Sequence, residues 1–417
     1  MLKCKTPWLT RQVSTLATCV LLALSQPIMA DSSSHLPSMK AWLNDNLSRN
    51  PQLQAARAAM DIAKAGVQAA DRPLYNPELQ LELERTDIDT RSAGISQTLD
   101  WYGKREARGN VARLQKEVSG MEYERLQQTL ATRLLQALAN WQTATDIIRV
   151  SEKQMQLMEA FADVAERRHA AGDLSQAELG LAHLAAANAR FQLSSAETGQ
   201  IKAKEALTAV TGKQQLSPPR FNPEIQVSNL SMIDVGKQLD KLPQIRAAKA
   251  RIALATAGVT VKKREQRADP TVGLRLGTED DNSLGALTLS IPLFVRNRFR
   301  AEVDQATATV IQVSREAAAL RQETRARLQA SAAVLQKLQN TWNQWQSAGA
   351  PILGQRTELL DRLWRAGEIR TTDYLVQLKQ TLETETNAIE QRNQLWQAWT
   401  DWLSTSGEIE QWLDGES

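Results

Sequence analysis

The residues that could do chemistry in this 417-residue chain are few and far apart. The three histidines are His35, His169 and His183, and no two of them stand four residues apart, as a zinc-binding pair on a helix would. Both cysteines, Cys4 and Cys19, lie within the first thirty residues. No Ser/His/Asp set or phosphate-binding loop is visible. The sequence therefore predicts no catalytic residue, no metal site and no cofactor, and the chain is not expected to be an enzyme.

Charged side chains instead alternate with leucines on short strand-like segments. Leu79–Glu84 places leucine at every second position and Gln80, Glu82 and Glu84 between, and Arg275 lies between leucines in a similar segment. If the leucine rows face lipid, these charged side chains point into a water-filled barrel lumen. They would then either tune the ion preference of the lumen or only keep the lumen hydrated.

The charge balance limits the classes of partner that the chain can bind. Lys and Arg total 50 and Asp and Glu total 47. The surplus of three is Lys3, Lys5 and Arg11, because residues 1–30 contain no acid. The rest of the chain is neutral, which excludes a strongly basic surface and predicts no nucleic-acid partner.

Residues 1–30 have the pattern of a secretory signal peptide. A basic start is followed by the apolar run Val13–Leu24 and by the small residue Ala30, after which we expect cleavage. The mature chain would then have no thiol. Leu16–Cys19 faintly resembles a lipoprotein signal, but Thr18 is the wrong residue before the cysteine. Lipidation of Cys19 is therefore only the alternative to cleavage after Ala30. No later stretch has the 18 consecutive apolar residues of a transmembrane helix.

The chain is duplicated, with two copies of roughly 190 residues. Asn50–Ala58 returns as Leu242–Ala250, and Ala171–Leu174 returns as Ala366–Ile369. Such self-similarity means that both copies form the same supersecondary unit. We expect a first repeat at 31–216, a proline-rich linker at 217–232, a second repeat at 233–413 and a tail at 414–417.

Each repeat is predicted to carry two strands joined by a polar loop. The expected bounds are about 78–86 and 94–102 in the first repeat, and about 271–278 and 284–293 in the second. Segments of this length match tilted transmembrane strands. Surface hairpins on a soluble helical protein are the alternative that the strand pattern leaves open.

A very long helix follows the strands in each repeat, at about 104–170 and about 296–366. The first would extend about 100 Å, because a helix rises 1.5 Å per residue. The second is expected to kink at Gly349–Pro351. Glycines then end these helices in two hairpin tips, at 171–175 and 366–371. Helices of this length are typical of coiled coils, tunnels and stalks.

Four strands cannot close a barrel, and an open sheet edge in lipid leaves backbone groups without hydrogen bonds. Three chains would supply twelve strands. The predicted fold class is thus mainly α with a small β part. Duplicated long-helix hairpins form an α-helical tunnel, and four transmembrane strands per chain contribute to a trimeric 12-stranded barrel, so that both repeats share one barrel and one tunnel.

The chain resembles the TolC family of outer-membrane efflux proteins over essentially its whole mature length. The segments that carry the resemblance are Asn50–Leu53, Asn76–Leu79, Ser96–Arg105, Leu289–Phe294 and the two tips. The short length and Gly103–Arg105 are more similar to the CzcC branch, which serves heavy-metal efflux.

The resemblance implies a passive homotrimeric channel of a tripartite efflux system in the Gram-negative outer membrane, with a periplasmic helical extension. Its partners would be outer-membrane lipid, a periplasmic adaptor (membrane fusion protein) and an inner-membrane pump of the RND type. The residues implied in adaptor docking are Ala171, Gly172, Asp173, Leu174, Ser175, Ala366, Gly367, Glu368 and Ile369.

The resemblance also implies a ring of carboxylates at the tunnel aperture. Asp373 matches such a position, and Glu178 is its equivalent in the first repeat. The alternative is that these acids only favour the positive end of a helix dipole. Two other functions stay open: a channel for type I protein secretion, and a soluble periplasmic coiled-coil adaptor or scaffold.

Overall fold

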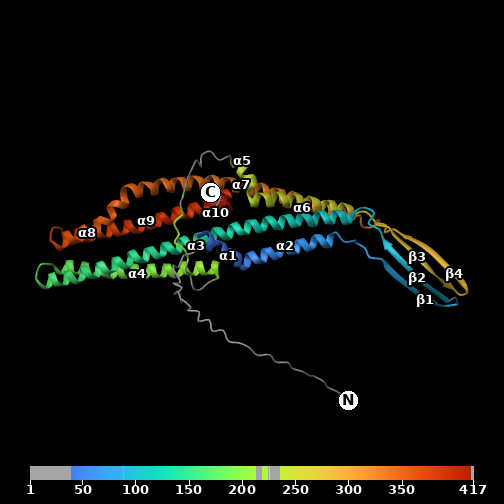
Figure 1. Ribbon diagram of the computed structural model, residues 1–417, viewed down its shortest axis with the longest axis horizontal. Coiled ribbons are helices and arrows are strands. Elements are labelled where there is room, and N and C mark those ends of the chain that lie inside the picture. Colours follow the sequence, from blue (N-terminus) through green and yellow to red (C-terminus); the bar gives the residue numbers. More distant parts are fainter. Residues whose placement is uncertain (1–38, 88, 213–217, 224, 226–234, 415–417) are drawn as a thin grey trace, which may run out of the picture. The chain divides into compact units, whose positions relative to one another are not determined.

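The computed structural model describes residues 39–87, 89–212, 218–223, 225 and 235–414, all within one compact unit, Pro37–Ser417 (Figure 1). The expectations for the signal peptide, for most of the linker and for 415–417 lie outside these residues. The first repeat contains α1 (Met39–Arg49), α2 (Pro51–Ala70), β1 (Glu78–Arg85), β2 (Asp89–Thr98), α3 (Lys104–Ala170) and α4 (Gln176–Thr211). The second contains α5 (Val235–Lys241), α6 (Pro243–Glu265), β3 (Thr271–Glu279), β4 (Asn282–Ser290), α7 (Arg300–Gln344), the π-helical turn η2 (Trp345–Gly349), α8 (Ala350–Arg365), α9 (Thr371–Ser406) and α10 (Ile409–Asp414).

The strands form one antiparallel sheet in the order β1-β2-β3-β4, at the end of the unit away from the tips (Figure 1). The central pair, β2 and β3, joins the two repeats, with Thr98 opposite Thr271. The expected class, mainly α with a small antiparallel β part, is confirmed.

The expected bounds of two strands, β2 and β4, differ from those of the structure. β2 runs from Asp89 to Thr98, not from 94 to 102, because it pairs with β1 and β3 on both sides and even its polar residues take part in the ladder. It ends where Leu99–Gly103 turn into α3. β4 starts at Asn282 and stops at Ser290, not at 293; Pro292 has no N–H to donate.

The second long helix also differs from the expectation of one helix over 296–366. It starts at Arg300, after Phe299 takes a left-handed conformation (φ 53°), and it is interrupted by η2. Pro351 cannot donate to the carbonyl of Ser347, and the wider π turn just before it accommodates the missing hydrogen bond. The first long helix, α3, is continuous over its 67 residues.

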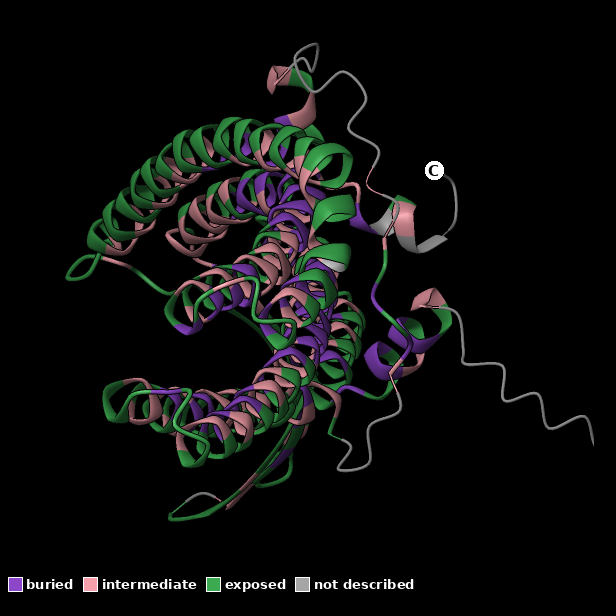
Figure 2. Cartoon of the chain, turned by 90° about the vertical axis from the view of Figure 1, so that its left-hand side faces the viewer, coloured by how far each residue is buried: buried purple, intermediate pink, exposed green. Residues whose placement is uncertain are grey.

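Two apolar clusters hold the helices together. One lies along the middle of α3 and is centred on Leu135, Leu138 and Trp399. The other lies near the tips and contains Phe161 and Trp364. Buried residues are concentrated where helices face each other, and the helices follow an arc when viewed along their length (Figure 2). The arc leaves α2, α4, α7 and α8 with one open side each.

Candidate functional site

The two faces of the sheet are chemically different. On one face the strands align Leu79, Ile95, Leu274 and Leu287 in a single row across all four strands. The leucines of this face are 50% to 83% exposed, although leucine is normally among the most buried residues. They are Leu79, Leu81, Leu83, Leu274, Leu276, Leu287 and Leu289.

The opposite face is polar and crowded. Ser92 and Ser96 are buried there, although no second layer covers the sheet. A Cβ on Gly277 would collide with the Arg91 carbonyl oxygen and lie 2.7 Å from the Ser92 Cβ, so β2 and β3 approach each other closely on this face. The sheet therefore curves with the polar face inside and the leucine face outside.

The predicted lumen residues all lie on this polar face. Arg275 donates to the carboxylate of Glu82, which also accepts from Ser92 Oγ at 3.2 Å. Glu84 lies two residues further along β1, opposite Thr90 of β2. The structure thus brings Glu82 and Arg275 together as an ion pair and places Glu84 beside them.

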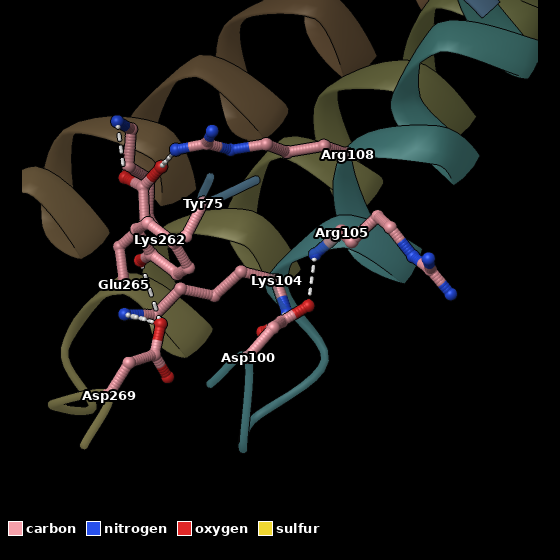
Figure 3. Close-up of polar contacts among 8 residues, drawn as sticks. All are labelled: Tyr75, Asp100, Lys104, Arg105, Arg108, Lys262, Glu265 and Asp269. Carbon is pink, nitrogen blue, oxygen red and sulfur yellow. Dashed lines mark hydrogen bonds and ion pairs between the residues drawn. The ribbon is translucent and has the colours of Figure 1, made fainter. Parts of the chain in front are cut away.

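A buried polar cluster, here called the junction, connects the sheet to the long helices (Figure 3). Lys104, the first residue of α3, binds the Asp269 carboxylate at 3.0 Å, and their side chains are only 9% and 3% exposed. The Tyr75 hydroxyl donates to the same carboxylate at 2.8 Å. Burial, followed by this bond to a charged acceptor, raises the pKa of Tyr75 to about 12. Asp100 caps α3 by accepting the Lys104 N–H at 2.6 Å.

A second ionic layer lies one turn further along the helices. Glu265 of α6 binds Lys262 at 2.9 Å and Arg108 of α3 at 3.2 Å (Figure 3). Burial raises the pKa of Glu265, but the hydrogen bonds from Lys262 and Arg108 outweigh it, and the net pKa is lowered. The junction therefore fixes the first repeat to the second where strands become helices.

Sequence reasoning missed the junction, although one signal was present. Asp269 occupies the repeat position that Asn76 holds in the first copy, so the second copy carries a charge where the first has an amide. A buried carboxylate needs a cation, and Lys104 is the one that the fold brings to it.

The first tip is a tightly capped turn. Gly172 takes a left-handed conformation (φ 83°) that a β-branched residue could not adopt without strain. The Ser175 Oγ accepts the Glu178 N–H at 3.2 Å, and Glu178 accepts the Ser175 N–H at 3.0 Å, which completes a capping box. The bond from the Ser175 hydroxyl, with that from its backbone, lowers the pKa of Glu178. Ala171 and Asp173 are exposed, whereas Leu174 is buried in the hairpin.

The second tip is similar in backbone but weaker in capping. Gly367 has φ 77°, and Arg370 occupies the N-cap of α9 without a side-chain cap bond. Arg370 binds Asp373 at 2.8 Å on the protein surface. Ala366 and Glu368 are exposed, and Ile369 is half-buried. Both candidate aperture acids, Asp373 and Glu178, are thus engaged by a residue three positions before them, which also fits their interpretation as helix-start acids.

The two tips are bound to each other. Arg168 of α3 donates to the carbonyls of Trp364 and Arg365 at 3.3 and 3.4 Å and lies over the Trp364 ring at 4.9 Å. Trp364 also stacks on Tyr374, with ring centroids 5.0 Å apart. Burial, with a smaller contribution from Asp361, raises the pKa of Tyr374 to about 12. The tips therefore form one edge made of both repeats.

The histidines have structural neighbours. The His169 ring is 2.8 Å from the Leu174 carbonyl across the first tip, and His183 is 3.5 Å from Glu166. His35 lies outside the described residues. Within the described part of the chain, no group of three His, Cys, Asp or Glu side chains could hold a metal ion.

Solved structures share this architecture. The outer-membrane channel CmeC from Campylobacter jejuni superposes with a TM-score of 0.74 at 13% identity, covering 95% of this chain and 94% of that chain. The channel OprN gives a TM-score of 0.74 at 16% identity, covering 88% and 89%. Among the residues the structure describes, no helix has a stretch apolar enough to cross a bilayer. The fold is that of outer-membrane channel proteins.

Sequence comparison agrees. A family model described as outer membrane efflux protein matches residues 42–213. The cobalt-zinc-cadmium resistance protein CzcC from Cupriavidus metallidurans is 26% identical over 278 residues, which cover 65% of this chain and 66% of that protein. The chain thus aligns with about two thirds of this relative's length. Residues 42–213 thus match the outer membrane efflux protein family, and the chain shares the fold of TolC-family channels over most of its length. Proteins of this family are passive channels, in agreement with the expectation that the chain is not an enzyme.

Proposed function

We propose that three copies of this chain form a passive exit duct through the outer membrane. The observation that carries the proposal is the sheet, a single layer with a strongly exposed leucine face and two free edges, β1 and β4. Exposed apolar rows of this kind favour lipid over water, and free edges are tolerated in lipid only when another strand closes them. Twelve strands from three copies satisfy both needs, and the Glu82–Arg275 pair then faces the water-filled lumen.

The helical tips are the proposed docking edge for a periplasmic adaptor, which would connect the duct to an inner-membrane pump that supplies the energy. Support comes from the exposed residues at both tips and from the Arg168 contacts that hold them as one edge. Asp373 and Glu178 are proposed to line the aperture beside these tips.

Heavy-metal cations are the proposed substrates, supported by the similarity to a cobalt-zinc-cadmium resistance protein. A strain that lacks the chain should become more sensitive to cobalt, zinc and cadmium salts and should recover with the plasmid-borne gene. Sensitivity to organic toxins without any change for metals would redirect the proposal to small organic solutes.

The first test of the duct is its native mass in mild detergent, after extraction from outer membranes. A mass of three chains is expected. A soluble monomer in the periplasm would overturn the channel and favour a coiled-coil scaffold.

Docking is tested by Gly172→Val combined with Gly367→Val. The variant should lose resistance, because valine cannot adopt φ values of 83° and 77° without deforming both turns. It should keep the trimer mass, because the tips lie at the opposite end of the unit from the sheet and no atom lies within 4 Å of either added Cβ. Gly120→Val, also free of neighbours within 4 Å but far from the tips, is the matched control and should keep both. If the tip variant lost the trimer while Gly120→Val kept it, the tips would be needed for assembly, and the docking proposal would be wrong.

A further inference from the structure

The duplication lets the contact inside the chain serve as a template for a contact between chains. Within the chain, the first repeat meets the second through β2 with β3, α3 with α6 and α3 with α9. The elements that correspond to these on the outer sides are β4 and β1, α7 and α2, and α8 and α4. All of them have an open side within the described unit (Figure 1). Several of their large apolar side chains are also exposed: Ile62, Leu184, Phe191, Ile311, Ile352 and Leu359.

One ion pair marks the in-chain contact at the start of α3. Arg264, at the C-terminal end of α6, binds Glu106 at 3.0 Å, and it also donates to the carbonyl of Gly103. Gly103 precedes α3 in a left-handed conformation (φ 65°), and Glu106 is the third residue of that helix.

Each of these residues has a counterpart on the outer sides. Arg264 corresponds to Arg72, since α6 follows α2 by 192 positions (243 − 51). α7 follows α3 by 196 positions (300 − 104), so Glu106 corresponds to Glu302, again the third residue of its helix. Phe299, which precedes α7, repeats the left-handed conformation of Gly103, with φ 53°.

The counterparts lack partners in the described chain. Arg72 is exposed, and neither it nor Glu302 makes a side-chain hydrogen bond or ion pair with any described residue. The Glu302 Oε2 atom is nevertheless shielded from solvent and unsatisfied. A shielded carboxylate oxygen without a donor is costly, and a guanidinium is the group that best satisfies it.

We propose that Arg72 of one copy binds Glu302 of the next copy, as Arg264 binds Glu106 within the chain. The inference rests on the proposed ring of copies and names a contact that holds it. The contact is head-to-tail, because it joins the outer side of a first repeat to the outer side of a second repeat, and such contacts form a ring when their rotation closes.

The strands give an independent check on this geometry. Glu78 pairs with Ser96 in the first repeat as Thr271 pairs with Ser290 in the second, which gives offsets of 193 and 194. These offsets convert the observed pair of Ile95 with Leu274 into a pair of Leu289 with Leu81 of the next copy. Likewise Leu287 comes opposite Leu83. The leucine face thus continues across the boundary between copies without a break. A register shifted by one residue would instead place the leucines of one strand on the polar face.

Cysteine cross-linking tests the proposal, because the only native cysteines are Cys4 and Cys19. An arginine–carboxylate pair separates its Cα atoms too far for a direct disulfide, so a bis-methanethiosulfonate reagent spans the gap. Arg72→Cys with Glu302→Cys in one chain, treated with this reagent in isolated outer membranes, should give bands of two and three chains on a non-reducing gel, and reductant should collapse them. Each single variant controls for the native cysteines. Arg264→Cys with Glu106→Cys is the matched control and should close within one chain.

A charge exchange provides the second readout. Arg72→Glu and Glu302→Arg should each lower the temperature at which trimers separate in detergent, and the two together should restore it. Trimers that show neither trapping nor restoration would overturn this contact and leave the duct standing. A chain that never assembles would overturn the duct as well.

Discussion

The two helical hairpins, α3 with α4 and α7–α8 with α9, repeat one unit but differ in how continuous and how buried their long helices are. In the first, α3 is a continuous helix of 67 residues with Leu134, Leu135 and Leu138 almost fully buried. In the second, the corresponding helix is interrupted by η2, and only Thr324, Leu328 and Leu335 of α7 are buried. α3 lies inside the arc, packed by α2, α4, α6 and α9, whereas α7 and α8 lie at its edge.

This difference teaches that neighbours, rather than the repeat pattern, decide how regular each helix is. A helix packed on all sides keeps its ladder intact, because every distortion would open a cavity. A helix with a free side tolerates a π turn and partly exposed apolar residues. The free side of the second hairpin agrees with the contact proposed between copies.

The junction should show the largest difference between the repeats. Asp269→Ala should lower the free energy of unfolding by about 3–5 kcal/mol, because it leaves the Lys104 ammonium buried without its counter-ion. Asn76→Ala, at the same repeat position but exposed, should change it by less than about 0.5 kcal/mol. Urea unfolding in detergent, followed by circular dichroism, measures both. Equal losses of unfolding free energy in the two variants would mean that the Lys104–Asp269 pair adds no more stability than the equivalent position of the first repeat.

Helix continuity is the next contrast. Gly349→Ala should destabilise by about 1–3 kcal/mol, because its Cβ would collide with the Trp345 ring that packs over η2. Gly120→Ala in α3, where no atom lies within 4 Å of the new Cβ, should stabilise by about 0.5–1 kcal/mol. The same unfolding measurement applies. A stabilising Gly349→Ala would show that the π turn is not maintained by this contact.

The tips should differ by a smaller amount. Ser175→Ala removes the cap of α4 and should destabilise by about 1 kcal/mol. Arg370→Ala at the other tip removes no cap bond and should stay within about 0.5 kcal/mol. Hydrogen exchange of the first turns of α4 and α9 localises the effect, and faster exchange in α9 after Arg370→Ala would contradict the comparison.

The smallest effect is the response of the first tip to acid. The Ser175 bonds lower the pKa of Glu178, so this carboxylate contributes stability above the ordinary glutamate pKa of about 4.3 and loses it as the pH falls through the lower folded value. The protection of the amides at the start of α4, relative to their intrinsic exchange rates, should therefore fall on acidification. In Glu178→Gln this acid-dependent fall in protection should be absent. An unchanged pH profile in that variant would assign the response to another group.

Much of the fold followed from local patterns. The alternation at Leu79–Glu84 predicted a strand, the proline-free stretch from Lys104 predicted a long helix, and Gly172 and Gly367 predicted the turns. The limits of β2 did not follow, since they depend on two partner strands. Gly349–Pro351 did predict a kink in the second long helix, but its form as a π turn at Trp345–Gly349 also depends on the packing of Trp345 over Gly349. Of the candidate sites, the pairing of Glu82 with Arg275 followed only from the register of β1, β2 and β3.

The sequence by itself determined the duplication and the element types, because these depend on composition and on periods read along the chain, and its motifs carried the resemblance to the TolC family. Tertiary structure alone decided which copy of a repeated residue is buried. Asp269 and Asn76 occupy one repeat position, yet the fold encloses the first against Lys104 and Tyr75 and leaves the second exposed. A repeat fixes positions relative to its own unit, whereas burial and charge pairing depend on which unit packs beside it.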